Sequence, residues 1–296
     1  MKKRPFLLAS ALLAGLFVFF LALAVTVASF MGRPASFALG NKIGVIEVYG
    51  IIADSRQVIE QLHDFRDNNS IKALVLRIDS PGGGVAPSQE IHDEVKAVDA
   101  LKPVVVSMGS VAASGGYYIA APARKILANP GTIVGSIGVI MKFTNFQELL
   151  DKIGLNSVVV KSGEYKDIGS PTRDMTAAER EIIQNLIDDV HSQFVASVAE
   201  GRNIDEAIVR SIADGRIFSG RRAMELGLVD GMGSLEAAIR QAAELAGIVG
   251  EPTVVYPPGK KPRFIDLFIE ETLNRLQFAL QKQRSVGLQY LWRDFN

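Results

Sequence analysis

Apolar strand patterns alternate with amphipathic helix patterns between residues 42 and 250. Short runs rich in β-branched residues are typical of buried strands, and apolar residues at helical spacing are typical of surface helices. The expected strands are 42–50, 72–84 with its glycine-rich end, 103–109, 125–129 and 156–163. The expected helices are 54–68, 88–101, 117–123, 145–154, 176–202, 203–213, 219–227 and 233–247. This alternation predicts an α/β domain whose mostly parallel sheet is covered by helices on both faces.

An uncharged apolar run occupies residues 6–30. As a helix, these residues would span about 37 Å, enough to cross a hydrocarbon core of about 30 Å. The basic residues before the run predict a cytoplasmic N-terminus. We therefore expect a single-pass anchor in the cell (inner) membrane and an extracytoplasmic remainder. A cleaved signal peptide is the alternative, because small residues near position 28 offer a cleavage site.

The predicted organisation has five parts, some of which differ sharply in composition. The proline-rich, basic stretch after residue 250 indicates the end of the folded domain. Beyond it, apolar residues between 265 and 280 lie on one face of a predicted helix, which could dock on the domain, a neighbouring subunit or the membrane surface. The parts are a cytoplasmic start at 1–5, the anchor at 6–30, a linker at 31–41, the domain at 42–250, and a linker with an amphipathic tail at 251–296.

Composition excludes several functions. Lysine plus arginine and aspartate plus glutamate both number 32, so no strong positive field points to a nucleic-acid partner. The chain has no cysteine, which excludes thiolate chemistry and disulfides. The glycine-rich loops match neither nucleotide-binding fingerprint, and the three histidines form no metal-binding pair, so we expect no cofactor and no metal. A Ser-His-Asp triad remains open, because triads assemble from distant segments.

The sequence "GSVAASGGYY" at residues 109–118 places Ser114 between a predicted strand and a predicted helix. Such a corner would expose the hydroxyl at a helix N-terminus, where free N–H groups favour developing negative charge. The two following glycines would let a substrate backbone approach closely. The alternative is a helix-capping serine followed by glycines that serve tight packing.

Acyl transfer needs a nucleophile, a base and oxyanion donors. The glycine loop at residues 82–84 and the residue after Ser114 offer backbone N–H groups. Lys161, at the end of the predicted strand 156–163, and Lys166, just after it, are the candidate bases, although either could be a surface lysine. A lysine serves as a base only where burial or nearby cations favour its neutral form.

Several ordered motifs resemble the short bacterial form of signal peptide peptidase A, a membrane-anchored peptidase family (S49) with a Ser/Lys dyad. The resemblance covers roughly residues 42–245. It implies that Ser114 is the nucleophile and Lys166, rather than Lys161, the base. It also implies that Ser136 hydrogen-bonds the lysine and that Gly83 and Gly115 form the oxyanion hole. The motifs are "DSPGGGV", "GSVAASGGYYIA", "GSIGVI", "KSGEYKDIGSP" and "IFSGRRAMELGLVDGMGSLEAAI".

The same resemblance implies a fold and a function. The fold is the ClpP/crotonase-like one, in which stacked ββα units assemble into ring-shaped homo-oligomers. The function is a serine endopeptidase that degrades remnant signal peptides at the membrane after secretion, with the dyad shared between subunits and no cofactor. Tyr117 and Tyr118 are expected to be packing residues. The alternatives are a crotonase-fold enzyme acting on a coenzyme A thioester, and a non-catalytic membrane scaffold.

The predicted membrane topology can be tested in spheroplasts. With the basic N-terminus inside and one span, protease added outside should digest residues 31–296, because that whole region would be extracytoplasmic. Immunoblotting against the domain measures the loss, with a cytoplasmic protein as the control for intact cells. Protection of the domain in intact spheroplasts would contradict this topology.

Overall fold

The computed structural model describes residues 15–17, 19–20, 41–258 and 289–291. The chain divides into two compact units, Met1–Gly40 and Asn41–Asn296. The second unit holds the sheet and its helices. Most of the predicted anchor at 6–30 and all of the predicted tail helix lie outside the described residues. Within the described ranges, no helix is both long and apolar enough to cross a membrane.

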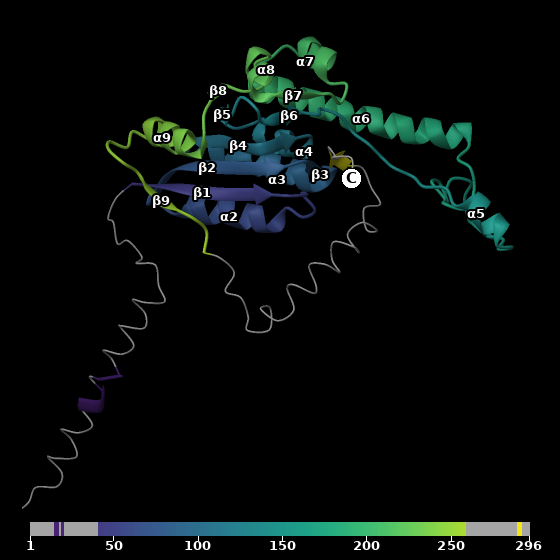
Figure 1. The fold of residues 1–296 in the computed structure, drawn as a ribbon, viewed down its shortest axis with the longest axis horizontal. Helices are drawn as coiled ribbons and strands as arrows, with labels where there is room; N and C mark the ends of the chain where they lie inside the picture. The colour runs from purple at the N-terminus through teal and green to yellow at the C-terminus, as the bar shows by residue number, and fades with distance from the viewer. Residues whose placement is uncertain (1–14, 18, 21–40, 259–288, 292–296) are drawn as a thin grey trace, which may run out of the picture. The chain divides into compact units, whose positions relative to one another are not determined.

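The main sheet of the second unit has eight strands, which are parallel except for one antiparallel pair at an edge (Figure 1). The path β7-β6-β4-β2-β1-β9 contains six of them, and β5 joins β4 to β8 beside this path. The strands on the path are β7 (Ile217–Ser219), β6 (Ile133–Gly135), β4 (Val104–Ala113), β2 (Ile71–Ser80), β1 (Lys42–Tyr49) and β9 (Thr253–Val255). The other two are β5 (Lys125–Ala128) and β8 (Gly231–Met232).

Helices cover both faces of this sheet, as the sequence predicts. Alternate residues of β1 and β2 point to opposite faces, because side chains in a strand have a period of two. Val45 and Val75 belong to the core under α9 (Leu235–Leu245), whereas Ile46 and Leu76 belong to the larger core on the other face. That larger core includes residues of α2 (Arg56–Asp67), α3 (Val85–Asp99), α4 (Gly115–Ala120), α6 (Ala177–Arg202), α7 (Glu206–Ile212) and α8 (Gly220–Glu225). The confirmed α/β fold is therefore a sheet buried on both sides.

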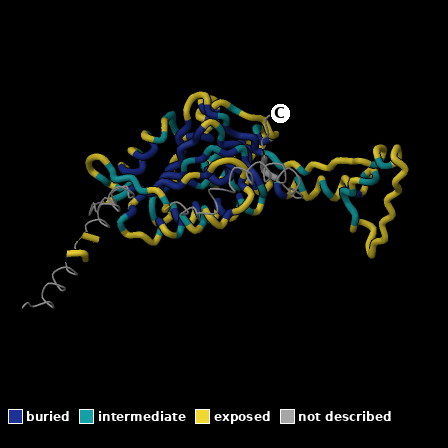
Figure 2. The backbone as a smooth tube through the Cα atoms, turned by 60° about the horizontal axis from the view of Figure 1, so that its bottom comes forward, coloured by how far each residue is buried: buried dark blue, intermediate teal, exposed yellow. Residues whose placement is uncertain are grey.

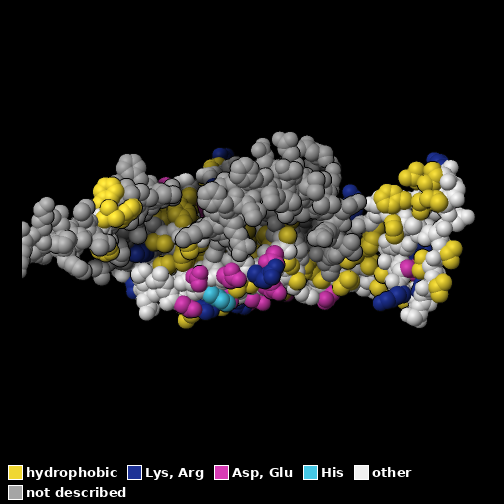
Figure 3. Space-filling view, turned by 90° about the horizontal axis from the view of Figure 1, so that it is seen from below, with side chains coloured by type: hydrophobic (Ala, Val, Ile, Leu, Met, Phe, Trp, Pro, Cys, Tyr) yellow, Lys and Arg dark blue, Asp and Glu magenta, His cyan; other side chains and the backbone are white. Residues whose placement is uncertain are grey.

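Residues 140–189, here called the arm, extend away from the sheet (Figures 1 and 2). The arm contains α5 (Gln147–Lys152) and the first half of α6. The whole of α6 is about 39 Å long at about 1.5 Å per residue. Most buried residues of α6 lie in its second half, from Val190 onward. Figure 3 shows hydrophobic side chains gathered at the arm's end of the unit. The exposed large hydrophobic residues of the arm are Ile140, Phe143, Phe146, Leu149, Ile153, Leu155, Val158, Val159, Val160, Tyr165, Ile182 and Leu186.

The structure corrects some expected elements. The predicted strand 156–163 is wrong, since these residues form no strand and Val158 and Val160 are 85% and 96% exposed. Several very short strands were not expected, among them β3 (Gly82–Gly84), which consists of three glycines, and β6 and β7. Strand β9 pairs with β1, so the sheet takes in residues beyond the predicted domain end at 250.

Candidate active site

Strands β2, β4 and β6 end at the same edge of the sheet. Ser80 at the end of β2 lies opposite Ala112, and Ala113 at the end of β4 lies opposite Gly135. Ser114 follows β4 directly, and Ser136 follows β6 directly. The carboxyl edge of parallel strands is where α/β proteins commonly place their ligands. The sequence motifs thus meet in space although they are separate along the chain.

Ser114 occupies a strained corner between β4 and α4. Its φ is 55° and its ψ is −121°, a conformation that residues with a side chain rarely adopt and that persists only when surrounding contacts enforce it. Its N–H donates to the carbonyl of Gly135 at 2.7 Å. Its carbonyl accepts the N–H groups of Tyr117 and Tyr118 at 2.9 and 2.8 Å. These three bonds fix the Ser114 backbone from the neighbouring strand and from the helix.

The hydroxyl of Ser114 makes no capping hydrogen bond to α4. The alternative interpretation of a helix-capping serine is therefore not supported. The expectation of an exposed hydroxyl is also corrected, because Ser114 is only 1% exposed in the single chain. Residues with backbone strain of this kind cluster at functional sites.

The two glycines after Ser114 have different surroundings. Gly115 begins α4, so its N–H has no acceptor within the helix and is free for another partner. A Cβ on Gly116 would lie 2.7 Å from the carbonyl oxygen of Ser80, so this glycine allows α4 to pack on the end of β2 rather than giving room to a substrate. Tyr117 is fully buried and donates its hydroxyl to the carbonyl of Leu228 at 2.8 Å, a packing role as predicted.

Gly83 lies in β3, which packs against α4. The carbonyl of Gly82 accepts from the N–H of Ile52 at 2.9 Å, and the N–H of Gly84 donates to the carbonyl of Ile52 at 2.8 Å. Since neighbouring residues of a strand direct their polar groups to opposite edges, the N–H of Gly83 points to the other edge of β3. There the strand β10 (Gln289–Leu291) pairs with β3 in the antiparallel sense. A Cβ on Gly83 would lie 2.1 Å from the carbonyl oxygen of Ile52, so only glycine fits.

Ser136 shares the unusual backbone of Ser114. Its φ is 51°, it follows Gly135 with a φ of 89°, and it is buried. Its N–H donates to the carbonyl of Arg216 at 2.8 Å. Gly135, the residue before Ser136, accepts the N–H of Ser114. The backbones of the two serines are therefore neighbours. Four of the predicted site residues, Gly83, Ser114, Gly115 and Ser136, thus gather at one edge of the sheet.

Lys166 is not brought to this edge within one chain. It lies in the arm, its side chain is exposed, and among the described residues it makes no side-chain hydrogen bond or ion pair. Its segment is attached to the first turn of α6 at Glu179, whereas α4 contacts α6 at Phe194, whose ring lies 4.9 Å from that of Tyr118. The fifteen residues between these two contacts correspond to about 22 Å along the helix. The contact of α6 with the Lys166 segment and its contact with α4, which follows Ser114, are therefore well separated along the helix.

Arg173 attaches the Lys166 segment to α6. Its guanidinium donates two hydrogen bonds to the carboxylate of Asp167, each at 2.9 Å, and two to that of Glu179, one of them at 2.8 Å. Glu179 also forms a capping box with Thr176 at the start of α6. The hydrogen bonds from Arg173 hold the pKa of Asp167 far below its usual range and lower that of Glu179 to about 2. The carboxylates in turn raise the pKa of Arg173.

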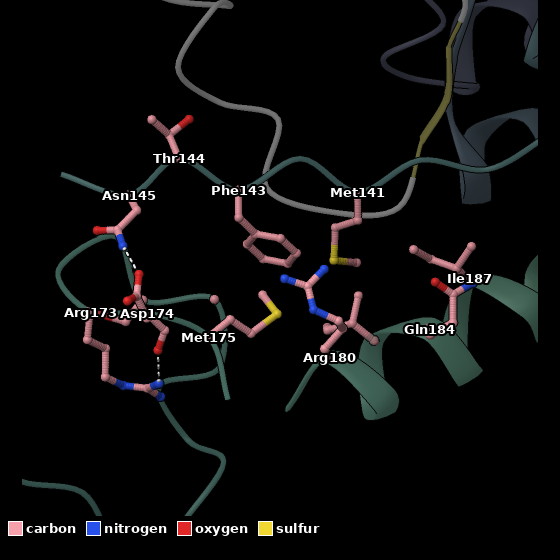
Figure 4. Close-up of a pocket in the computed structure, with 13 residues that line it drawn as sticks. Met141, Phe143, Thr144, Asn145, Arg173, Asp174, Met175, Arg180, Gln184 and Ile187 are labelled. Carbon is pink, nitrogen blue, oxygen red and sulfur yellow. Dashed lines mark hydrogen bonds between the residues drawn. The ribbon is translucent and has the colours of Figure 1, made fainter. Parts of the chain in front are cut away.

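A cavity of about 420 Å³ lies beside this attachment, between the chain before α5 and the first half of α6 (Figure 4). Its apolar wall includes Met141, Phe143 and Ile187, and Arg180 extends into it. None of the residues at the carboxyl edge lines it. The cavity is therefore a feature of the arm, separate from the Ser114 site.

The histidines do not complete a triad with Ser114 in the described structure. His92 on α3 packs against the ring of Tyr118 at 4.8 Å, and its Nδ1 lies 2.9 Å from the carboxylate of Asp93. Burial lowers the pKa of His92. His63 pairs with Glu94. No hydrogen bond between a histidine and Ser114 is present among the described residues, and none of their acidic and histidine side chains cluster as a metal site.

Comparison with known proteins agrees with a peptidase. The sequence model of Peptidase family S49 matches residues 96–249, and that of Clp protease matches residues 43–132. "Putative protease slr0021" of Synechocystis sp. is 47% identical over 216 residues, which cover 73% of this chain and 78% of the relative. "Putative signal peptide peptidase SppA" of Enterococcus faecium is 38% identical over 216 residues, covering 68% of this chain and 63% of the relative.

A solved structure of a ClpP1 mutant from Listeria monocytogenes has a TM-score of 0.46 and 20% identity, covering 66% of this chain and 93% of that one. The α/β fold places a buried, strained serine at the carboxyl edge of its sheet. The chain belongs to peptidase family S49, and it is a serine peptidase. This membership sets aside the two alternatives, an acyl-coenzyme A enzyme and a non-catalytic scaffold.

The attachment made by Arg173 was not predicted from the sequence. Thr176 and Glu179 have the spacing of a capping box, but the loop residues Asp167 and Arg173 follow no helical or strand period. Only the folded loop brings the guanidinium between the two carboxylates.

Gly116→Ala tests the packing of the corner. The added Cβ would meet backbone rather than a movable side chain, so we expect the free energy of unfolding to fall by about 1–3 kcal/mol. Peptidase activity should also fall, by more than the loss of folded protein explains, because a displaced α4 would move the N–H of Gly115. Gly131→Ala is the control, since a Cβ there meets nothing within 4 Å, and should change stability by less than about 0.5 kcal/mol. Urea titration measures stability, and peptide hydrolysis measures activity. If Gly116→Ala matched Gly131→Ala in both, the role of Gly116 would be contradicted.

Proposed function

We propose that this serine peptidase is an endopeptidase that uses a Ser114/Lys166 dyad. The observation that carries the proposal is the Ser114 corner, where contacts from β6 and α4 enforce a positive φ while the hydroxyl is not used for capping. Strain of this kind is typically retained where it places a reactive group. The N–H of Gly115, and that of Gly83 once β10 no longer pairs with it, are the donors that we propose for the oxyanion.

In this mechanism the Ser114 Oγ attacks the peptide carbonyl while neutral Lys166 accepts the hydroxyl proton. The backbone N–H groups of Gly83 and Gly115 donate hydrogen bonds to the tetrahedral oxyanion. Lys166 then gives its proton to the leaving amine. Water, activated by the same lysine, hydrolyses the acyl-enzyme. The Ser136 hydroxyl, next to Ser114, accepts a hydrogen bond from the lysine and orients it.

We propose that Lys166 comes from a neighbouring copy of the chain. Within one chain, α6 contacts the Lys166 segment and α4 at well-separated points, so the dyad is incomplete. The arm that carries Lys166 also carries an unusual number of exposed apolar side chains. Contiguous apolar surface of this kind commonly marks a protein interface. If a second copy covered the arm of the first, the Lys166 of the first chain would reach the Ser114 of the second. Repetition of this heterologous contact would close a ring.

The substrate is an extended peptide. The edge of β3 that presents Gly83 already pairs with an antiparallel strand, β10, so it can accept extended backbone in this direction. Added strands gain their affinity from main-chain hydrogen bonds, which suits cleavage of varied sequences. Together with the apolar run at 6–30 and the name of the Enterococcus faecium relative, this supports remnant signal peptides as substrates and a membrane-anchored, extracytoplasmic enzyme.

Lys166→Arg tests the base. Arginine keeps the positive charge but does not deprotonate at accessible pH, so we expect no peptide hydrolysis and no acylation of Ser114. In the unchanged enzyme, both rates should rise with pH as the lysine loses its proton. A fluorogenic peptide assay and mass spectrometry of the adduct with a serine-reactive probe measure the two rates. A Lys166→Arg enzyme that remains active would refute the dyad.

Subunit mixing tests the shared dyad. Ser114→Ala and Lys166→Ala should each be inactive as pure assemblies. Dissociated, mixed in equal amounts and reassembled, they should recover about a quarter of the unchanged activity, because one in four neighbour pairs unites both intact residues. Mixed assemblies are verified by two affinity tags. Verified mixed assemblies with no recovered activity would show that the dyad lies within one chain.

A further inference from the structure

Asp167, the residue directly after Lys166, is engaged by two cations. The Nζ of Lys161 lies 2.5 Å from Asp167 Oδ1 and also donates to the carbonyl of Glu164 at 2.7 Å. The guanidinium of Arg173 binds both carboxylate oxygens of Asp167. The Asp167 side chain is only 13% exposed, so water screens these contacts weakly. The first lysine of the motif, Lys161, is thus tied to the carboxylate beside the second, Lys166.

Arg173 alone does not balance the charge around Asp167. The same guanidinium also binds Glu179, whose side chain is 3% exposed. One positive charge faces two negative ones, and Lys161 supplies the second positive charge. The network of Lys161, Asp167, Arg173 and Glu179 is therefore neutral as a whole.

A free carboxylate beside Lys166 would harm catalysis. A negative charge within a few ångströms favours the protonated form of a lysine, and a protonated lysine cannot accept the hydroxyl proton of serine. The side chain of Lys166 makes no ion pair among the described residues, so Asp167 is already engaged elsewhere. This step rests on the proposed function, in which Lys166 is the base.

We propose that Lys161 is a positioning residue for the catalytic base: its ion pair with Asp167 neutralises the carboxylate next to Lys166 and holds it away from that lysine. Lys161 does not touch the substrate or the reacting atoms. It acts on Lys166 through Asp167, and any cation of similar reach can replace it. The role of the motif's first lysine is thus to keep the second one neutral.

The surroundings of Asp167 support this assignment. From its own segment it is faced by Lys161 and Arg173, and from α6 by Glu179 across the shared guanidinium. The chain before α5 contributes the uncharged ring of Phe143, which lies against Gly169. The nearby acid Asp174 is engaged separately, because its carboxylate accepts from the side chain of Asn145.

The test compares Lys161→Met with Lys161→Arg in the full chain. Met removes the charge, so the acid limb of the pH profile of kcat/KM should move to higher pH by about half a unit to one unit. At a pH on that limb, activity should fall about three- to tenfold. Lys161→Arg keeps the cation and should retain the unchanged profile. The double variant Lys161→Met/Asp167→Asn removes the carboxylate as well and should return the profile to its original position.

The position of the profile on the pH axis does not depend on how much enzyme is folded, so partial loss of stability would not imitate the effect. If the Lys161→Met and unchanged profiles superimpose, or if Asp167→Asn does not restore the shifted profile, the inference is wrong. If Lys166→Arg itself is active, the proposed dyad has failed instead. A dead Lys166→Arg enzyme combined with superimposed Lys161 profiles would refute only the role of Lys161.

Discussion

The Ser114 backbone is the constraint on which the rest of the site depends. A serine with a φ of 55° is unfavourable by itself, and the chain holds it there with the bond from its N–H to Gly135 and with the N–H groups of Tyr117 and Tyr118, which bond its carbonyl. Those contacts require β6 beside β4, and they require α4 to approach β2 so closely that position 116 has no room for a side chain. The conformation of Ser114 thus depends on both the order of the strands and the packing of α4 against the sheet. The proposed mechanism needs this arrangement, because it places the Ser114 hydroxyl beside the first N–H of α4, that of Gly115.

Much of the fold was predictable because it depends on local patterns. The long buried strands β1, β2 and β4 are rich in β-branched residues, and they were recognised from that pattern. The short strands were missed for a physical reason. β3 is made of three glycines, which have low strand propensity, and it exists only because Ile52 and β10 supply partners. The opposite error occurred at Val158–Val160, where high strand propensity has no neighbouring strand in the single chain.

The site was predictable to the extent that it is built from motifs. Gly83, Ser114, Gly115 and Ser136 were selected along the sequence, and the parallel strands place them at one edge. Their catalytic roles stay predictions. The network around Arg173 could not be foreseen, because its other members come from separate places: Lys161 and Asp167 from a loop without periodicity, and Glu179 from a helix start. Burial was also misjudged at Ser114, since exposure depends on how β3, β6 and α4 close around the corner.

The division of the molecule into an edge that carries the nucleophile and an arm that carries the lysine has a consequence for control of the reaction. A peptidase whose dyad forms within one chain is active as soon as it folds, and it can cleave any accessible protein. In this chain, Ser114 is buried and lacks a base, while Lys166 is exposed without a partner among the described residues. If a second copy covers the arm as proposed, the contact would remove hydrophobic area from water and so favour assembly. The same association would bring lysine to serine, so activity and enclosure of the site would arise together. The ion pair of Lys161 fits this arrangement, since it leaves Lys166 without a carboxylate partner before the neighbouring serine arrives.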